Sequence, residues 1–114
     1  LLTAPYTFYN VINGYPAWVN IAKKVAIWYI PHWEEWAVGQ LDKLGSNWRM
    51  WSGLDTDQGD RNPHELPDNS RGFSSWYYWA GSLGVWLMEN ANSDISVKKE
   101  GKIVLIDEKC PNYQ

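Results

Sequence analysis

The sequence predicts an α+β domain in which about three helices pack on a small antiparallel sheet that includes a C-terminal β-hairpin. Three segments, 17–30, 31–45 and 74–90, place apolar residues at spacings of three and four, the period of an amphipathic helix. The segment 95–107 instead alternates apolar and polar residues around Glu100–Gly101, which is typical of a hairpin. At 114 residues, the chain is long enough to bury the core of one domain.

The N-terminal part predicts a strand, a turn and a first helix. Tyr6–Ile12 is rich in aromatic and β-branched residues and indicates an extended segment. Asn13–Pro16 is a turn signal, because Asn-Gly tolerates positive φ angles. From Ala17 to Ile30 the apolar residues fall on one helical stripe, which comprises Trp18, Ile21, Ala22, Val25, Trp28 and Tyr29.

Two further helices follow from the same reasoning. Pro31 suits the first turn of a helix, and Gly45 suits its C-terminal cap. The apolar face of this helix comprises Trp33, Trp36, Ala37, Leu41 and Leu44. A third helix is predicted from Ser74 or Ser75 to Asn90, with Trp76, Trp79, Ala80, Leu83, Trp86 and Leu87 on its stripe. Gly81 and Gly84 disfavour a helix by about 1 kcal/mol each, so we expect another element to pack closely against them.

The chain is predicted to form a single domain, 1–114, and its remaining parts are predicted to be irregular. The segment 46–72 is dense in turn-forming residues and lacks a clear period, which indicates a long functional or mobile loop. The residues 108–114 are expected to form a loose tail.

Charge and composition restrict the classes of function. The net charge is −3 and the basic residues are scattered among acids, so the basic stripe of a nucleic-acid binder is missing from the sequence. The single cysteine, Cys110, cannot form a disulfide within the chain, which favours a reducing, cytoplasmic environment. The start without Met indicates a processed or trimmed product. The longest uncharged runs are too short or too polar for a transmembrane span, although an interfacial contact with a membrane is compatible with them.

The most informative feature is the aromatic content, with nine Trp and seven Tyr. Trp48 and Trp51 lie outside the helical stripes and flank a polar loop. Aromatic side chains beside acids and Arg are typical of protein interfaces and of sites for polar ligands such as carbohydrates. The predicted binding residues are therefore Trp48, Arg49, Trp51, Asp55, Asp57, Asp60, Arg61 and His64.

We therefore predict a small non-enzymatic binding domain that recognises a protein partner or a polar ligand through the loop 46–72. One alternative is a metal-assisted hydrolase that uses Asp55, Asp57, Asp60 and His64, with Ca²⁺ or Mg²⁺ on the three aspartates. Their spacing differs from that of an EF-hand, and turn formation explains these acids without a metal, so we expect no cofactor. A second alternative is a Trp-rich subunit of a complex or of a peripheral membrane protein.

A transition-metal site is a weaker hypothesis. His32 and Glu35 would lie one helical turn apart, and His64 and Glu65 could add ligands if the loop folded back. Zinc sites normally show fuller clusters of ligands. A polar helix start and a loop histidine therefore explain these residues better.

Overall fold

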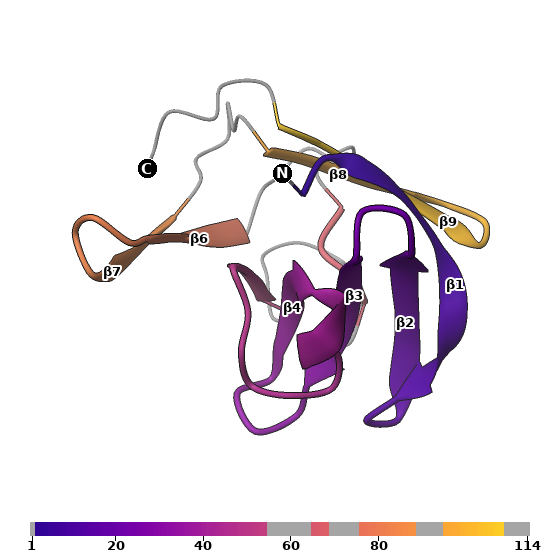
Figure 1. Ribbon diagram of the computed structural model, residues 1–114. Coiled ribbons are helices and arrows are strands. Elements are labelled where there is room, and N and C mark those ends of the chain that lie inside the picture. Colours follow the sequence, from indigo (N-terminus) through magenta and orange to yellow (C-terminus); the bar gives the residue numbers. More distant parts are fainter. Residues whose placement is uncertain (1, 55–64, 69–75, 89–94, 109–114) are drawn as a thin grey trace.

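The predicted α+β class is wrong, because the protein is built from one curled antiparallel β-sheet (Figure 1). The computed structural model describes residues 2–54, 65–68, 76–88 and 95–108. Within these ranges the only helical element is a short 3-10 turn, η1 (Leu41–Lys43). Among the described residues, no helix has the length and apolar character needed to cross a membrane.

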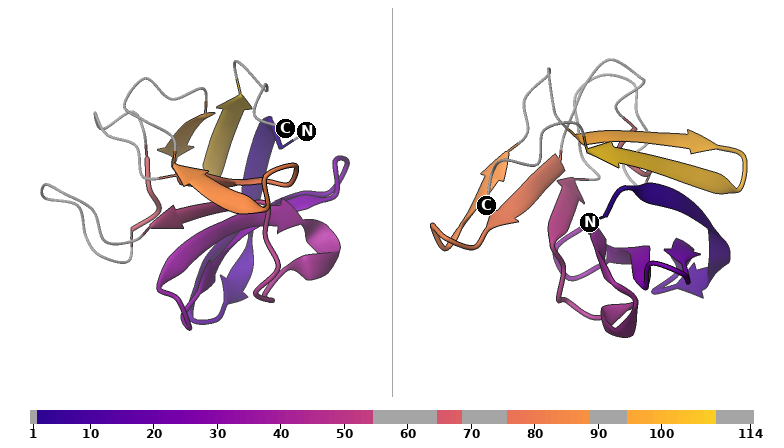
Figure 2. Two further views of the ribbon diagram at one scale, coloured as in Figure 1. Left: turned by 90° about the vertical axis from the view of Figure 1, so that its left-hand side faces the viewer. Right: turned by 45° about the horizontal axis from the view of Figure 1, so that its top comes forward.

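The sheet contains nine described strands in the order β7-β6-β5-β4-β3-β2-β1-β9-β8. Their bounds are β1 (Ala4–Ile12), β2 (Tyr15–Asn20), β3 (Val25–Ile30), β4 (Glu35–Gln40), β5 (Trp51–Leu54), β6 (Trp76–Ala80), β7 (Val85–Met88), β8 (Ile95–Glu100) and β9 (Ile103–Glu108). The first seven strands form a meander, and the hairpin β8–β9 returns to pair with β1. The hairpins β6–β7 and β8–β9 therefore occupy opposite ends of the sheet, as the right view in Figure 2 shows.

The curl of the sheet is linked to β1, which pairs with both β2 and β9. Its N-terminal part, Ala4–Thr7, pairs with β9, whereas Thr7–Ile12 pairs with β2. The register with β2 shifts between Phe8 and Asn10, an irregularity of the kind that bends and twists a strand. In Figure 1 β1 bends along its length, so that β8 and β9 lie over one end of the meander.

The predicted helix 17–30 is wrong because its apolar residues are buried on both faces of a sheet. All six residues of β3 are buried. Val25, Ile27 and Tyr29 belong to one core cluster, whereas Ala26, Trp28 and Ile30 belong to a second cluster on the other face. A continuous apolar run fits a helical period as well as any other period, so it cannot distinguish a helix from a doubly buried strand.

The predicted helices 31–45 and 74–90 are also wrong, because each of the three predicted helices, 17–30 included, contains a turn between strands. The four-residue turns Ile21–Lys24, Pro31–Glu34 and Gly81–Gly84 connect successive antiparallel strands. Each ends in a residue with positive φ, at 58°, 52° and 68° respectively. Gly84 therefore serves a left-handed turn position rather than the close packing of a helix. Lys24 and Glu34 lack the glycine signal, which is why the sequence conceals their turns.

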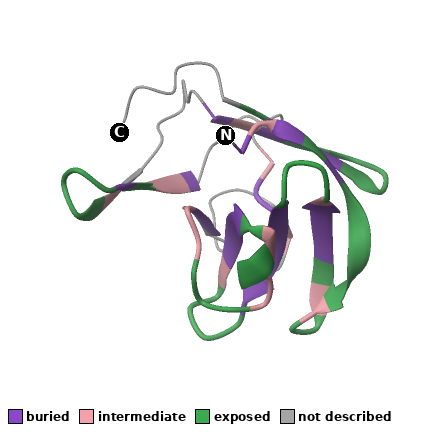
Figure 3. Ribbon diagram, viewed as in Figure 1, coloured by how far each residue is buried: buried purple, intermediate pink, exposed green. Residues whose placement is uncertain are grey.

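The main core cluster lies between the strands β2–β6 and the strands β1, β8 and β9, where buried residues concentrate (Figure 3). Its centre is aromatic: the ring centroids of Trp18 and Trp36 are 5.9 Å apart, and those of Tyr29 and Trp36 are 5.3 Å apart. Trp76 is fully buried, and its indole Nε1 donates a hydrogen bond to the carbonyl oxygen of Pro67 at 3.2 Å.

Two local predictions are confirmed. The predicted strand Tyr6–Ile12 lies within β1, and the Asn13–Gly14 turn after it has the positive φ angles of a tight hairpin. The predicted hairpin 95–107 corresponds to β8 and β9. The predicted loop 46–72 contains the strand β5, while 55–64 and 69–72 lie outside the described residues, as does 109–114 of the predicted tail.

Candidate functional site

Three segments that are distant in sequence converge on one aromatic groove of about 400 Å³. We call it the Trp–Arg groove, and its lining residues are Trp33, Asn47, Trp48, Arg49, Trp79 and Trp86. Trp33 comes from the β3–β4 turn, residues 47–49 precede β5, and the last two tryptophans come from the hairpin β6–β7. The meander brings these segments together because β4, β5, β6 and β7 are consecutive in the sheet.

The guanidinium of Arg49 is the charged centre of the groove. Its Nη2 lies 3.2 Å from Oε1 of Glu35, and its Nη1 donates to the carbonyl oxygen of Asn47 at 3.1 Å. The same carboxylate oxygen accepts a 2.7 Å hydrogen bond from the buried hydroxyl of Ser52. The side chains of Arg49 and Glu35 are only 14% and 22% exposed, so solvent screens this ion pair less than a surface pair.

Two indoles contact the same guanidinium. The Cζ atom of Arg49 lies 4.4 Å from the ring centroid of Trp33 and 4.8 Å from that of Trp86. Both distances are within the range of cation–π attraction. Trp79 extends the aromatic surface, because it pairs with Trp86 across the two strands and their centroids are 5.5 Å apart. The groove is therefore an aromatic surface around the guanidinium of Arg49, whose charge is neutralised by Glu35.

Backbone and side-chain hydrogen bonds fix the segment that carries Trp48 and Arg49. The amide of Met50 donates to the carbonyl of Val38 at 2.9 Å, and the carbonyl of Met50 accepts from the amide of Trp79 at 3.0 Å. The indole Nε1 of Trp28 donates to the carbonyl of Ser46 at 2.8 Å. The segment that carries Trp48 and Arg49 is therefore attached to the strands β3 and β4 and to the hairpin β6–β7.

The groove exposes aromatic faces that folding has not covered. Trp33, Trp79 and Trp48 are 43%, 47% and 71% exposed. Glu35 compensates the charge of Arg49, and the Nζ atom of Lys43 lies 5.9 Å from the ring centroid of Trp48. These properties suit a ligand with uncharged, apolar groups that stack on indole rings, with hydrogen bonds at its edges.

The structure brings together two of the predicted binding residues and separates a third. Trp48 and Arg49 line the groove, whereas Trp51 is buried in the main core cluster. The other predicted binding residues, Asp55, Asp57, Asp60, Arg61 and His64, lie outside the described residues. The proposed Ca²⁺ or Mg²⁺ site falls on the same undescribed segment.

The helical interpretation concealed the other three tryptophans of the groove. It assigned Trp33, Trp79 and Trp86 to buried stripes, although the first two are among the exposed apolar residues. The turn residues Gly81–Gly84 were the available signal. A hairpin centred on them pairs Trp79 with Trp86, because strands that meet at a turn place opposite residues on one face.

The described residues show no metal centre. Among them, no group of three or more His, Cys, Asp and Glu side chains could hold a metal ion. His32 is exposed in the β3–β4 turn, where its ring packs 5.4 Å from that of Trp33. Glu35 lies in β4 and binds Arg49 and Ser52, so His32 and Glu35 do not share a helical turn as predicted.

No family model, curated protein or solved structure matches the chain.

Proposed function

We propose that the protein is a non-enzymatic binding domain whose Trp–Arg groove recognises an extended apolar peptide segment of a protein partner. The observation that carries the proposal is the convergence of Trp33, Trp48, Trp79 and Trp86 around Arg49. Trp and Arg are the residues that contribute most often to binding energy at protein interfaces. Exposed aromatic surface of this kind is unfavourable in water unless a partner covers it.

The edge of the sheet beside the groove favours a peptide over a carbohydrate. Trp86 lies on β7, which is the terminal strand at one end of the described sheet. Within the part of the chain that the structure describes, β7 has a strand neighbour on one side only. An extended peptide can pair with such an edge through its backbone and place alternate side chains against a neighbouring surface.

The neutralised centre of the groove supports the apolar character of that peptide. Because Glu35 already pairs with Arg49, an acidic ligand would compete with an existing carboxylate. Apolar side chains would instead gain contact area on Trp33, Trp48 and Trp79. Arg49 then acts as a rigid spacer that keeps two indoles apart, and its own charge contributes little to affinity.

A synthetic array of short peptides, probed beside a glycan array, tests the proposal. We expect binding to peptides with alternating apolar residues. Replacing Trp48 or Trp79 with Ala should weaken binding by about tenfold or more, since truncating a central aromatic contact costs about 2 kcal/mol. Phe8→Ala provides a matched control, because Phe8 is a comparably exposed aromatic residue on β1.

Two results would contradict the proposal. Peptide binding that survives both Trp substitutions would place the binding site elsewhere. Binding to glycans alone, lost in the same variants, would replace the peptide with a polar ligand.

A further inference from the structure

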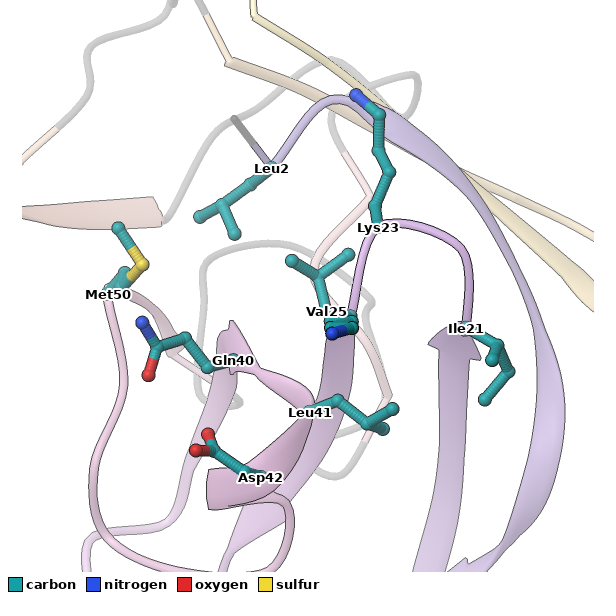
Figure 4. A pocket seen from close by; sticks show the side chains of 9 residues that line it. Leu2, Ile21, Lys23, Val25, Gln40, Leu41, Asp42 and Met50 are labelled. Atoms are coloured by element: carbon teal, nitrogen blue, oxygen red, sulfur yellow. The ribbon is translucent and has the colours of Figure 1, made fainter.

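A second cavity, separate from the Trp–Arg groove, lies beside the β2–β3 turn and has a volume of about 640 Å³ (Figure 4). Ligand sites for small molecules have volumes of about 300–1,000 Å³. The apolar part of its lining includes Leu2, Val25 and Met50. Leu2 and Val25 are buried members of the main core cluster, and Met50 packs against that cluster. Because Leu2 and Val25 are almost fully covered, the accessible apolar lining is that of Ile21, Leu41 and Met50.

Charged groups lie around the same cavity. Lys23 and Lys24 on the β2–β3 turn line it, and Gln40 and Asp42 line it from the end of β4 and from η1. In Figure 4 the side chains of Gln40 and Asp42 lie across the cavity from Lys23. Among the described residues that line the cavity, two ammonium groups and one carboxylate leave one net positive charge.

Hydrogen bonds fix the lysine-bearing turn. The carbonyl oxygen of Lys24 accepts from the amide of Leu41 at 2.8 Å, and the amide of Lys24 donates to the carbonyl of Ile21 at 3.1 Å. The ammonium of Lys23 donates to the carbonyl oxygen of Thr3 at 2.7 Å. An ammonium carries three donors, so this bond leaves capacity for an anion.

We propose that this cavity binds an amphipathic monocarboxylate. The apolar part of the ligand packs against Ile21, Leu41 and Met50, the apolar lining residues that remain accessible, and its carboxylate lies at Lys23 and Lys24. Mostly apolar walls with a small number of polar or charged groups are the usual arrangement of ligand sites. The excess of one positive charge selects an anion over a neutral or cationic ligand with the same chain. This site is independent of the peptide-binding function proposed for the groove.

Titration with octanoate, followed by methyl resonances in NMR spectra of the whole protein, tests the proposal. We expect the methyl groups of Ile21, Leu41 and Met50 to shift, with weaker binding of octanol and of octyltrimethylammonium. Lys24→Met should weaken octanoate binding by about two- to fivefold, and Asp42→Asn should strengthen it, because exposed charge pairs contribute up to about fivefold in affinity. Lys102→Met, in the exposed β8–β9 turn, should change nothing.

The opposite signs of the two variants separate an electrostatic site from damage to the fold. Equal affinity for the three octyl compounds would overturn the proposal, as would shifts confined to other methyl groups or no shifts at all. Identical effects of Lys24→Met and Asp42→Asn would also overturn it. Trp79→Ala should leave octanoate binding intact, so failure here is distinguishable from failure of the groove.

Discussion

Arg49 and Glu35 form a partly buried ion pair in which Nη2 and Oε1 are 3.2 Å apart. The pair connects the segment before β5 to the first residue of β4. It also positions the guanidinium between the indoles of Trp33 and Trp86, at 4.4 and 4.8 Å. The shape of the Trp–Arg groove therefore depends on a carboxylate that does not line it.

Glu35→Gln should destabilise the fold by about 1–2 kcal/mol, because it leaves a partly buried guanidinium without its counter-charge. Unfolding in urea measures the difference in the free energy of unfolding. Glu100→Gln is the matched control, since Glu100 pairs with Lys98 on the surface and is 54% exposed. A loss in Glu35→Gln no larger than in the control would show that the pair is not structurally important.

Gly53→Ala should destabilise the fold by about 1–3 kcal/mol through overpacking. A Cβ atom at Gly53 would lie 2.8 Å from Cζ3 of Trp76, and this indole is fully buried. Gly81→Ala is the control, because its nearest neighbour would be the indole of Trp79 at 3.6 Å, an ordinary contact. Equal melting temperatures of the two variants would contradict the packing described between β5 and β6.

Tyr6 should contribute to the loss of stability at alkaline pH. Burial raises the pKa of Tyr6 above its usual value of about 10, and its hydroxyl donates to the carbonyl of Leu2 at 2.6 Å. The folded state therefore holds the phenol proton more tightly than the unfolded state. This contribution is complete below a pH of about 10 and decreases as the pH rises towards the raised pKa.

Tyr6→Phe tests this contribution. It should cost about 1 kcal/mol at neutral pH through the lost hydrogen bond, and it should make stability fall less steeply above a pH of about 10. Urea unfolding at several alkaline pH values measures both effects. The exposed Tyr9 provides the control variant, Tyr9→Phe. Identical alkaline slopes for Tyr6→Phe and the unmodified protein would contradict the assignment.

The N-terminal hairpin turn and the C-terminal hairpin were predictable from sequence because each carries strong local signals. Asn13–Gly14 supplies a specific turn, and β8 and β9 alternate around Gly101. The centre was not predictable by the same rules. There β3 is buried on both faces, and the turns that end at Lys24 and Glu34 use charged residues at positive φ.

The candidate site was predictable in part for the same physical reason. Trp48 stood out because no helical stripe included it, and Arg49 was predicted with it as a neighbouring polar residue. The same reasoning wrongly included Trp51, which is buried in the core. Trp79 and Trp86, on the hairpin β6–β7, were instead predicted to be buried, because they lie on the apolar stripe of the predicted helix 74–90. Recognition of Gly81–Gly84 as a strand turn would have placed Trp79 and Trp86 opposite each other. The convergence with Trp33 depends on contacts between distant segments, which local periodicity does not encode.

The most direct test of the proposed recognition function is an NMR titration with the tightest peptide from the array, followed through the indole N–H resonances. The account predicts shifts for Trp33, Trp48, Trp79 and Trp86, with the core indoles of Trp28 and Trp36 unchanged. Shifts absent from these four groove indoles, at peptide concentrations that saturate binding, would contradict it.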